Sequence, residues 1–156
     1  MPSGVTIKDI DLGFEQLGRR LKRDGYVDIG FFHGEKTHPD TLVDMAQIAI
    51  QNEFGTSKIP ERSFMRSVVD ENQKKIIEFA AKERLRVADG KQSFDKFLTK
   101  TGLYVKSLIQ KKIATAQSWA VPNAPSTVAA KKGRETPLVD TSFMLKSVDY
   151  KKKVTK

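Results

Sequence analysis

Residues 66–119, which read RSVVDENQKKIIEFAAKERLRVADGKQSFDKFLTKTGLYVKSLIQKKIATAQSW, decide the fold. Apolar residues recur at three- and four-residue spacing over 66–88 and again over 92–119, which predicts two long amphipathic helices. The first stripe comprises Val69, Ile76, Phe79, Ala80 and Val87. Asp89 and Gly90 separate the two runs, and Ser93 is suited to cap the second helix. The two runs form either an antiparallel helix pair or one bent helix.

Two short segments outside these helices carry strand signals. Over residues 26–32, the side chains of Val27, Ile29 and Phe31 alternate onto one face, and Val148 and Tyr150 alternate near the other end of the chain. The later strand needs a partner, and the strand over 26–32 is the obvious one. The sequence therefore predicts an α+β fold, with a small, mainly antiparallel sheet packed against two long amphipathic helices plus shorter helices.

The rest of the chain predicts shorter elements around this framework. Residues 9–23 show helical spacing, and a further helix begins at Leu42 and runs out before Gly55, with Thr41 or Asp40 as its cap. Residues 121–136 carry three prolines, small residues and charges without periodicity, which predicts a long flexible loop or arm. We expect residues 1–156 to form a single domain, because this length supports one core.

The charge of the chain is concentrated in its C-terminal part. The net charge is +9, with −2 over residues 1–60, +1 over 61–90 and +10 over 91–156. Such an excess either attracts phosphate or another acidic surface, or simply keeps the protein soluble. No run reaches the roughly 18 apolar residues that a membrane-spanning helix needs, and the N-terminus lacks the layout of a secretory signal. We therefore expect no contact with a membrane.

No group of residues points to catalysis, a metal or a cofactor. The absence of cysteine excludes disulfides, thiolate metal sites and a cysteine nucleophile. His33 and His38 lie five residues apart in one loop, a spacing that fits no common metal site. Asp70 and Glu71 sit where the first turn of a helix favours acidic side chains. We expect a protein that is not an enzyme, with no catalytic residues, no metal and no cofactor.

The segment from Glu53 to Arg66 is not explained by helix or strand patterns. It places two aromatics, a fixed proline turn and two arginines within 14 residues. One interpretation is a connection anchored in the core, with Phe54 and Phe64 buried and the arginines in solvent. The other is a rigid contact loop, because arginine and aromatic side chains are enriched at protein interfaces.

This segment also resembles a family signature. Tailed-bacteriophage head–tail joining and tail-completion proteins show E-[FY]-G-T, then I-P-x-R-P-F-[LM]-R, a following helix, and P-L-[VI]-D-T-G-x-[LM] near the C-terminus. Here Glu53-Phe54-Gly55-Thr56 and Ile59-Pro60, Arg62, Phe64-Met65-Arg66 match the first two motifs, and Pro137-Leu138-Val139-Asp140-Thr141 with Met144 matches the third. The similarity spans roughly residues 26–150.

Two residues depart from the family pattern. Ser63 replaces the usual proline before Phe64, and Ser142 replaces the glycine after Thr141. The second replacement matters for the backbone, because serine adopts a positive φ less readily than glycine.

The resemblance implies an α+β subunit of the virion neck, located at the head–tail interface and assembled in the host cytoplasm. Such proteins act as tail terminators or tail-completion factors. They form a cyclic homo-oligomer, commonly a hexamer, that caps the tail tube and joins it to the head connector, and genomic DNA passes through the neck channel. Our candidate residues for contacts with neighbouring subunits and partners are Phe54, Ile59, Pro60, Arg62, Phe64, Arg66, Asp140 and Thr141.

The alternative hypothesis is a basic accessory protein that binds nucleic acid. Its affinity for DNA would fall steeply with salt, whereas assembly through apolar contacts would not. The candidate contacts for DNA or an acidic partner are Lys131, Lys132, Arg134, Lys151, Lys152 and Lys153.

Overall fold

The structure is a computed structural model, and it describes residues 13–131, 133, 135–138 and 142–155. The elements follow in the order α1 (Phe14–Leu21), β1 (Asp24–Gly30), α2 (Met45–Phe54), α3 (Met65–Ala88), α4 (Phe94–Ala114), the 3₁₀ turn η1 (Ala116–Ser118), α5 (Pro125–Ala130), α6 (Phe143–Ser147) and β2 (Asp149–Thr155). The predicted α+β class is confirmed.

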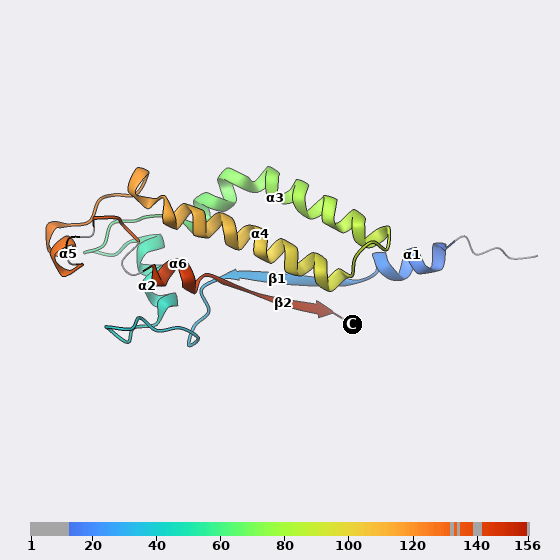
Figure 1. Ribbon diagram of the computed structural model, residues 1–156, viewed down its shortest axis with the longest axis horizontal. Helices are drawn as coiled ribbons and strands as arrows, with labels where there is room; N and C mark the ends of the chain where they lie inside the picture. Colours follow the sequence, from blue (N-terminus) through green and yellow to red (C-terminus); the bar gives the residue numbers. More distant parts are fainter. Residues whose placement is uncertain (1–12, 132, 134, 139–141, 156) are drawn as a thin grey trace, which may run out of the picture.

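The two long helices lie side by side as an antiparallel pair, and α4 lies between α3 and the strands (Figure 1). The turn between them reverses the chain at Gly90, whose φ of 74° lies in the left-handed region. The Ser93 hydroxyl then caps α4 by accepting a hydrogen bond from Lys96 N at 3.1 Å. The sequence left a single bent helix open, and the structure excludes it.

The sheet consists of β1 and β2, which pair antiparallel in a register that sets Ile29 opposite Tyr150. The predicted pairing of these two segments is therefore confirmed. The sheet lies close against α4 at Gly102, where an added Cβ would stand 2.6 Å from the Tyr150 ring and 3.0 Å from Val27. Glycine at this helix position thus lets the strands approach the helix backbone.

The main core lies where α2, α3, α4 and α6 meet. Phe64, Ile113 and Val148 are fully buried there. On α3, Val68 is buried while Val69 is 49% exposed, so our prediction that Val69 lies on the buried stripe is wrong. The helix begins directly after the buried Phe64, and the position of Phe64 in the core determines which side of α3 faces inward.

The start of α2 differs from our prediction. Neither Thr41 nor Asp40 caps this helix; the cap is Asp44, whose Oδ1 accepts from Ala46 N at 2.9 Å. Leu42 lies outside the helix with a φ of 56° and 77% of its surface exposed. The helix starts at Met45 rather than at Leu42, because Met45 N donates a hydrogen bond to Lys36 O and His38 N donates one to Val43 O.

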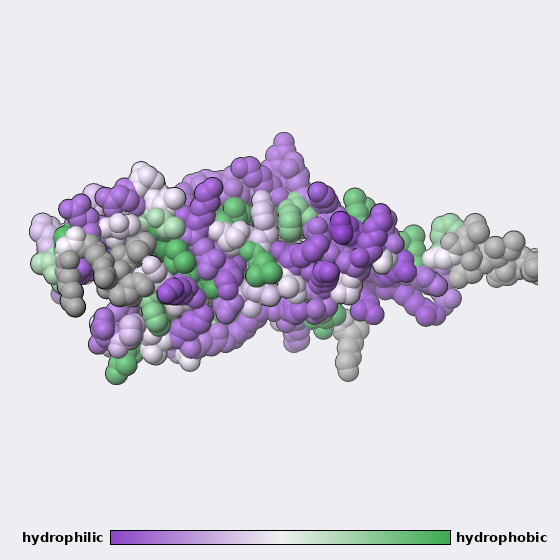
Figure 2. Space-filling view, in the orientation of Figure 1, coloured by the Kyte–Doolittle hydropathy of each residue, from purple (hydrophilic) through white to green (hydrophobic). Residues whose placement is uncertain are grey.

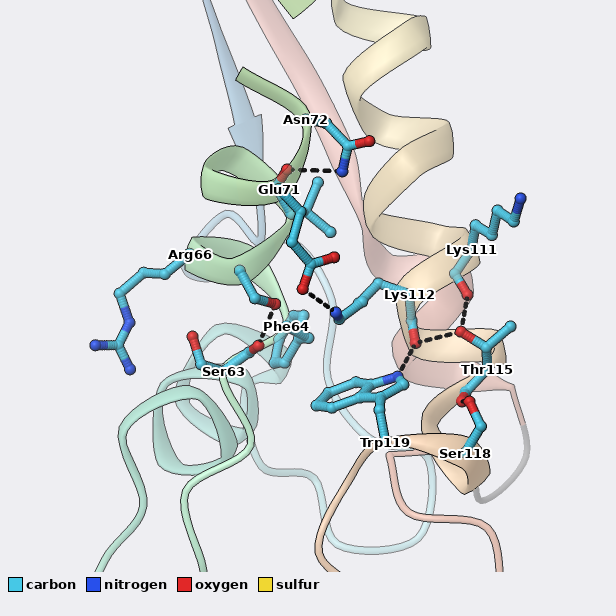
Figure 3. Close-up of polar contacts among 12 residues, drawn as sticks. Ser63, Phe64, Arg66, Glu71, Asn72, Lys111, Lys112, Thr115, Ser118 and Trp119 are labelled. Atoms are coloured by element: carbon cyan, nitrogen blue, oxygen red, sulfur yellow. Dashed lines mark hydrogen bonds and ion pairs between the residues drawn. The ribbon is translucent and has the colours of Figure 1, made fainter. Parts of the chain in front are cut away.

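The segment after α4 also differs. The helix ends at Ala114 rather than at 119, and Trp119 follows the turn η1. Its indole Nε1 donates to Lys112 O at 2.9 Å, and Lys112 Nζ lies 4.9 Å from the ring centroid and 2.6 Å from Glu71 Oε1 (Figure 3). The predicted arm over 121–136 contains the short helix α5, which begins with Pro125 at its first turn.

The face seen in Figure 2 is mostly hydrophilic, with hydrophobic side chains scattered along it. Within the described residues, no helix combines the length and the apolar character that a membrane span requires.

Candidate functional site

The segment from Glu53 to Arg66, called the motif loop below, joins α2 to α3 and is organised around the Glu53 carboxylate. Glu53 is 4% exposed, and its Oε2 accepts hydrogen bonds from Phe64 N at 2.8 Å and Met65 N at 2.9 Å. Its Oε1 accepts from Ser63 Oγ at 3.0 Å and Arg66 N at 3.0 Å. The last residues of α2 thereby cap the first turn of α3, whose N–H groups have no partner within the helix.

The pKa of Glu53 follows from this arrangement. Burial raises the pKa, but hydrogen bonds from Met65 N and Arg66 N, with further bonds from the side chains of Arg66 and Ser63, outweigh burial and hold the pKa below its ordinary value. The carboxylate is therefore ionised at neutral pH and acts as a fixed negative charge at the positive end of α3.

The tip of the motif loop is a tight turn from Gly55 to Ile59. Gly55 has a φ of 73°, and an added Cβ would meet Glu61 N at 2.9 Å. Thr56 N donates to Ile59 O at 2.8 Å, while Thr56 Oγ1 accepts from Ile59 N at 3.0 Å and Lys58 N at 3.2 Å. Glycine and threonine are thus required by the shape of the turn.

Arg62 fastens the motif loop to the segment that follows Trp119. It is 6% exposed, and its Nε donates to Val121 O at 2.8 Å. Its other bonds go to Pro122 O, Asn52 Oδ1 and Asn123 Oδ1 at 3.2–3.3 Å. All of these acceptors are neutral, and burial lowers the pKa of the guanidinium.

Arg66 closes the other side of the motif loop. Its Nε lies 3.1 Å from Glu53 Oε1, and its Nη2 lies 2.6 Å from Glu61 Oε1. The guanidinium carbon also stands 4.6 Å from the centroid of the Phe54 ring, which is a cation–π arrangement. The hydrogen bonds to Glu53 and Glu61 raise the pKa of Arg66.

The structure divides the interface candidates into two groups. Phe54 is 59% exposed, Pro60 and Arg66 are exposed, and Ile59 is half-buried. Phe64 is fully buried and Arg62 nearly so, because one fills the core and the other bonds four internal acceptors. Phe64 has no surface to offer a partner, so our expectation for this residue is corrected: it holds the loop in place from inside the core. The four side-chain hydrogen bonds of Arg62 are internal, and they also hold the loop in place.

The interpretation of the motif loop as a connection anchored in the core is correct only in part. Phe64 is buried, as a core-anchored connection requires, but Phe54 is exposed and Arg62 is not in solvent. Whether the exposed part contacts a partner stays a prediction.

The third motif is described only in part. Leu138 and Met144 are buried, while Asp140 and Thr141 lie outside the described residues. Ser142 has a φ of 58°, the left-handed conformation that the glycine of the family pattern would adopt at this position.

Lys151 and Lys152, two of the candidate contacts for DNA or an acidic partner, are engaged within the chain. Lys151 pairs with Glu35 and lies over the Phe32 ring, and Lys152 Nζ lies 2.6 Å from Asp95 Oδ2. Lys153 is exposed on β2. Lys131 is half-buried, and Lys132 and Arg134 lie outside the described residues. The last lysines thus belong to a paired strand rather than to a free basic tail.

The loop histidines do not come together as ligands. His33 Nδ1 faces Asp44 Oδ2, and His38 Nδ1 accepts from Asp40 N at 3.3 Å. Hydrogen bonds from Gly34 N and Ala46 N lower the pKa of Asp44. Over the ranges that the structure describes, no cluster of three or more His, Asp or Glu side chains is placed to hold a metal ion.

Sequence reasoning missed the structural roles of Glu53 and Arg62, the two polar side chains that organise the site. Glu53 enters the motif match without a role of its own, although a carboxylate followed by a helix start twelve residues later is a usable signal for a distant cap. Asn52 and Asn123, whose side-chain oxygens accept hydrogen bonds from Arg62, carry no sequence signal, since they lie in separate segments.

Comparison of the chain with protein-family models, with curated proteins and with solved structures finds no match.

Proposed function

We propose that this protein is a structural subunit of the neck of a tailed bacteriophage, which assembles into a ring at the head–tail junction, caps the tail tube and joins it to the head connector. The observation that carries this proposal is the motif loop. Residues that match the family signature, namely Glu53, Gly55, Thr56, Arg62 and Arg66, are those whose contacts fix the shape of the loop. The resemblance therefore rests on residues with a common structural purpose.

The motif loop also has the surface of a contact site. The Phe54 ring, stacked under Arg66, stands next to the fixed turn with Ile59 and Pro60. Aromatic and arginine side chains dominate binding energy at many protein interfaces. Because internal hydrogen bonds already hold this loop, little conformational entropy is lost when it binds.

The nucleic-acid alternative has less support. Among the C-terminal lysines, Lys106, Lys112 and Lys152 are paired with carboxylates of this chain. A bound phosphate would have to replace these pairs. Contact with DNA in the neck channel stays a secondary prediction, and it is tested by the salt dependence of DNA binding.

Ring formation tests the proposal. We expect the purified chain to form cyclic oligomers, measured by light scattering after size exclusion and seen by negative-stain electron microscopy. Phe54→Ala should shift the chain toward the monomer, whereas Leu85→Ala should not, because Leu85 is similarly exposed at 66% but lies on α3 away from the loop.

The location in the particle needs a separate measurement. A gold-labelled antibody against the protein should mark the head–tail junction of phage particles. Labelling of the capsid or tail fibres, or a chain that stays monomeric at every concentration, would contradict the proposal.

A further inference from the structure

A cavity of about 370 Å³ opens between α2, the motif loop, the segment with α5, and α6. Its polar wall carries the side chains of His38, Lys58, Arg62 and Lys131, and the described residues that line it include no aspartate or glutamate. Apolar side chains complete the lining, among them Met45, Ile48, Leu138, Phe143 and Met144. We call this the basic pocket.

Arg62 gives the basic pocket an uncompensated charge. A guanidinium has five N–H groups, and the four hydrogen bonds of Arg62 all go to neutral oxygens. One N–H of Nη1 is left without an acceptor among the described residues, and no ion pair with Arg62 or Lys58 is formed there. A buried charge without a counter-charge is costly, and an arriving carboxylate would remove that cost.

The apolar wall restricts which anion fits. Met144 is 6% exposed and Leu138 is 7% exposed, so the floor belongs to the core. A small hydrated anion would leave this surface wet, whereas a peptide segment that alternates acidic and apolar side chains would cover both walls. The basic pocket thus favours an acidic, amphipathic segment of protein.

The chain itself contains such a segment. Residues 5–12 read VTIKDIDL, in which Asp9 and Asp11 alternate with Ile10 and Leu12. These residues precede α1, and Figure 1 places α1 at one end of the elongated molecule and α2, α5 and α6 at the other. The helix to which this segment is joined therefore lies far from the basic pocket of its own chain.

We propose that residues 5–12 of one copy bind in the basic pocket of a second copy, with the carboxylates of Asp9 and Asp11 facing Lys58 and Arg62. The basic pocket and α1, the described helix that follows residues 5–12, lie at opposite ends of the subunit, so the proposed contact is head-to-tail, and head-to-tail contacts close into rings when the rotation allows. This inference rests on the proposed ring and names the contact that would close it.

Binding of a synthetic peptide tests the contact directly. The probe is fluorescein-labelled MPSGVTIKDIDL, which corresponds to residues 1–12. The receptor is the full chain with Asp9→Asn and Asp11→Asn, so that its own residues 5–12 compete less strongly for the basic pocket. We expect saturable binding by fluorescence anisotropy. Each lost charge-assisted bond should weaken it about tenfold, as about 1.4 kcal/mol implies. Lys58→Glu in the receptor should weaken binding by at least that factor, and Lys75→Glu, an exposed change on α3, should leave it unchanged.

Three results would overturn the proposal. The first is that the peptide does not bind, or that the receptors with Lys58→Glu and Lys75→Glu bind it equally. The second is that a benzophenone at peptide position 10 cross-links outside the basic pocket, for instance to the edge of β1 that does not pair with β2. The third is that the peptide binds only when the receptor also carries Asp140→Asn, which would show that the chain fills the basic pocket with its own carboxylate.

The oligomeric state separates this inference from the proposed function. If the full chain forms rings and the Asp9→Asn, Asp11→Asn variant forms them equally well, the ring proposal stands and the pocket contact is wrong. If the full chain forms no ring while the peptide binds as expected, the contact stands and the neck proposal is wrong.

Discussion

Replacing Glu53 by glutamine tests whether the carboxylate holds the motif loop. Gln has nearly the same shape but offers one acceptor oxygen, so its NH₂ group must face either the Phe64 and Met65 N–H groups or the donors on Ser63 and Arg66. At least two hydrogen bonds to a charged group are lost. At about 1.5–3 kcal/mol each, partly offset by relaxation, we expect Glu53→Gln to lower the free energy of unfolding by about 3 kcal/mol.

The assay is urea unfolding followed by circular dichroism and by the fluorescence of Trp119, the only tryptophan in the sequence. With a slope of about 2 kcal/mol per molar urea, the midpoint should fall by about 1.5 M. Glu78→Gln is the matched control, because Glu78 is exposed on the same helix that Glu53 caps. It should leave the midpoint unchanged.

The pH dependence gives a second, independent readout. The pKa of Glu53 is lower in the folded chain than its ordinary value of 4.5, so the unfolded chain binds more protons there. The stabilisation is present above the ordinary pKa and is lost as the pH falls through the lowered folded-state pKa. The difference between the parent and Glu53→Gln should therefore narrow in acid. A variant as stable as the Glu78→Gln control, or a difference that does not narrow, would refute the capping role.

Three further predictions concern particular contacts, all measured by thermal or urea unfolding. Gly102→Ala should destabilise the fold by about 1–3 kcal/mol, because the added Cβ would collide with the Tyr150 ring. Gly18→Ala should stabilise the fold by up to about 1 kcal/mol, because a Cβ at this position in α1 has no neighbour within 4 Å. Equal effects of the two changes would contradict the packing of β2 on α4. Ser142→Gly should raise stability by about 1 kcal/mol by removing the cost of a left-handed φ at a residue with a Cβ, and a loss would show that the serine side chain is needed. Phe64→Ala should cost about 3–5 kcal/mol, whereas Phe54→Ala should leave stability nearly unchanged, since only Phe64 is buried; similar losses would mean that Phe54 also serves the fold.

Local patterns predicted the parts of this molecule that local physics controls. The helices over Met65–Ala88 and Phe94–Ala114 follow from apolar spacing, and the Ser93 cap follows from the residue type that satisfies free N–H groups at a helix start. The strand at Asp24–Gly30 follows from alternation. Each of these signals is contained within a few neighbouring residues, so it can be recognised from the sequence.

Errors arose where a distant segment decided the outcome. Val69 fits the apolar stripe of α3 as well as Val68 does, and only the packing of Phe64 chooses between them. Lys152 belongs to a run that reads as a basic tail, yet strand pairing brings it to Asp95 on α4. Solvation of an arginine is the usual expectation, but Arg62 is drawn inside by oxygens of the segment 121–123.

The sequence by itself determined the α+β class, the two long helices, the strand pair and the motif loop as the segment that requires explanation. The tertiary structure alone decided which loop residues are exposed, which lysines are paired, and that Glu53 and Arg62 hold the loop from inside. The physical reason is the range of the interactions. Helical periodicity and caps act over one or two turns of the helix, whereas burial and polar pairing depend on groups that are distant in sequence. Arg62 and Val121, for example, are 59 residues apart, yet Arg62 Nε lies 2.8 Å from Val121 O.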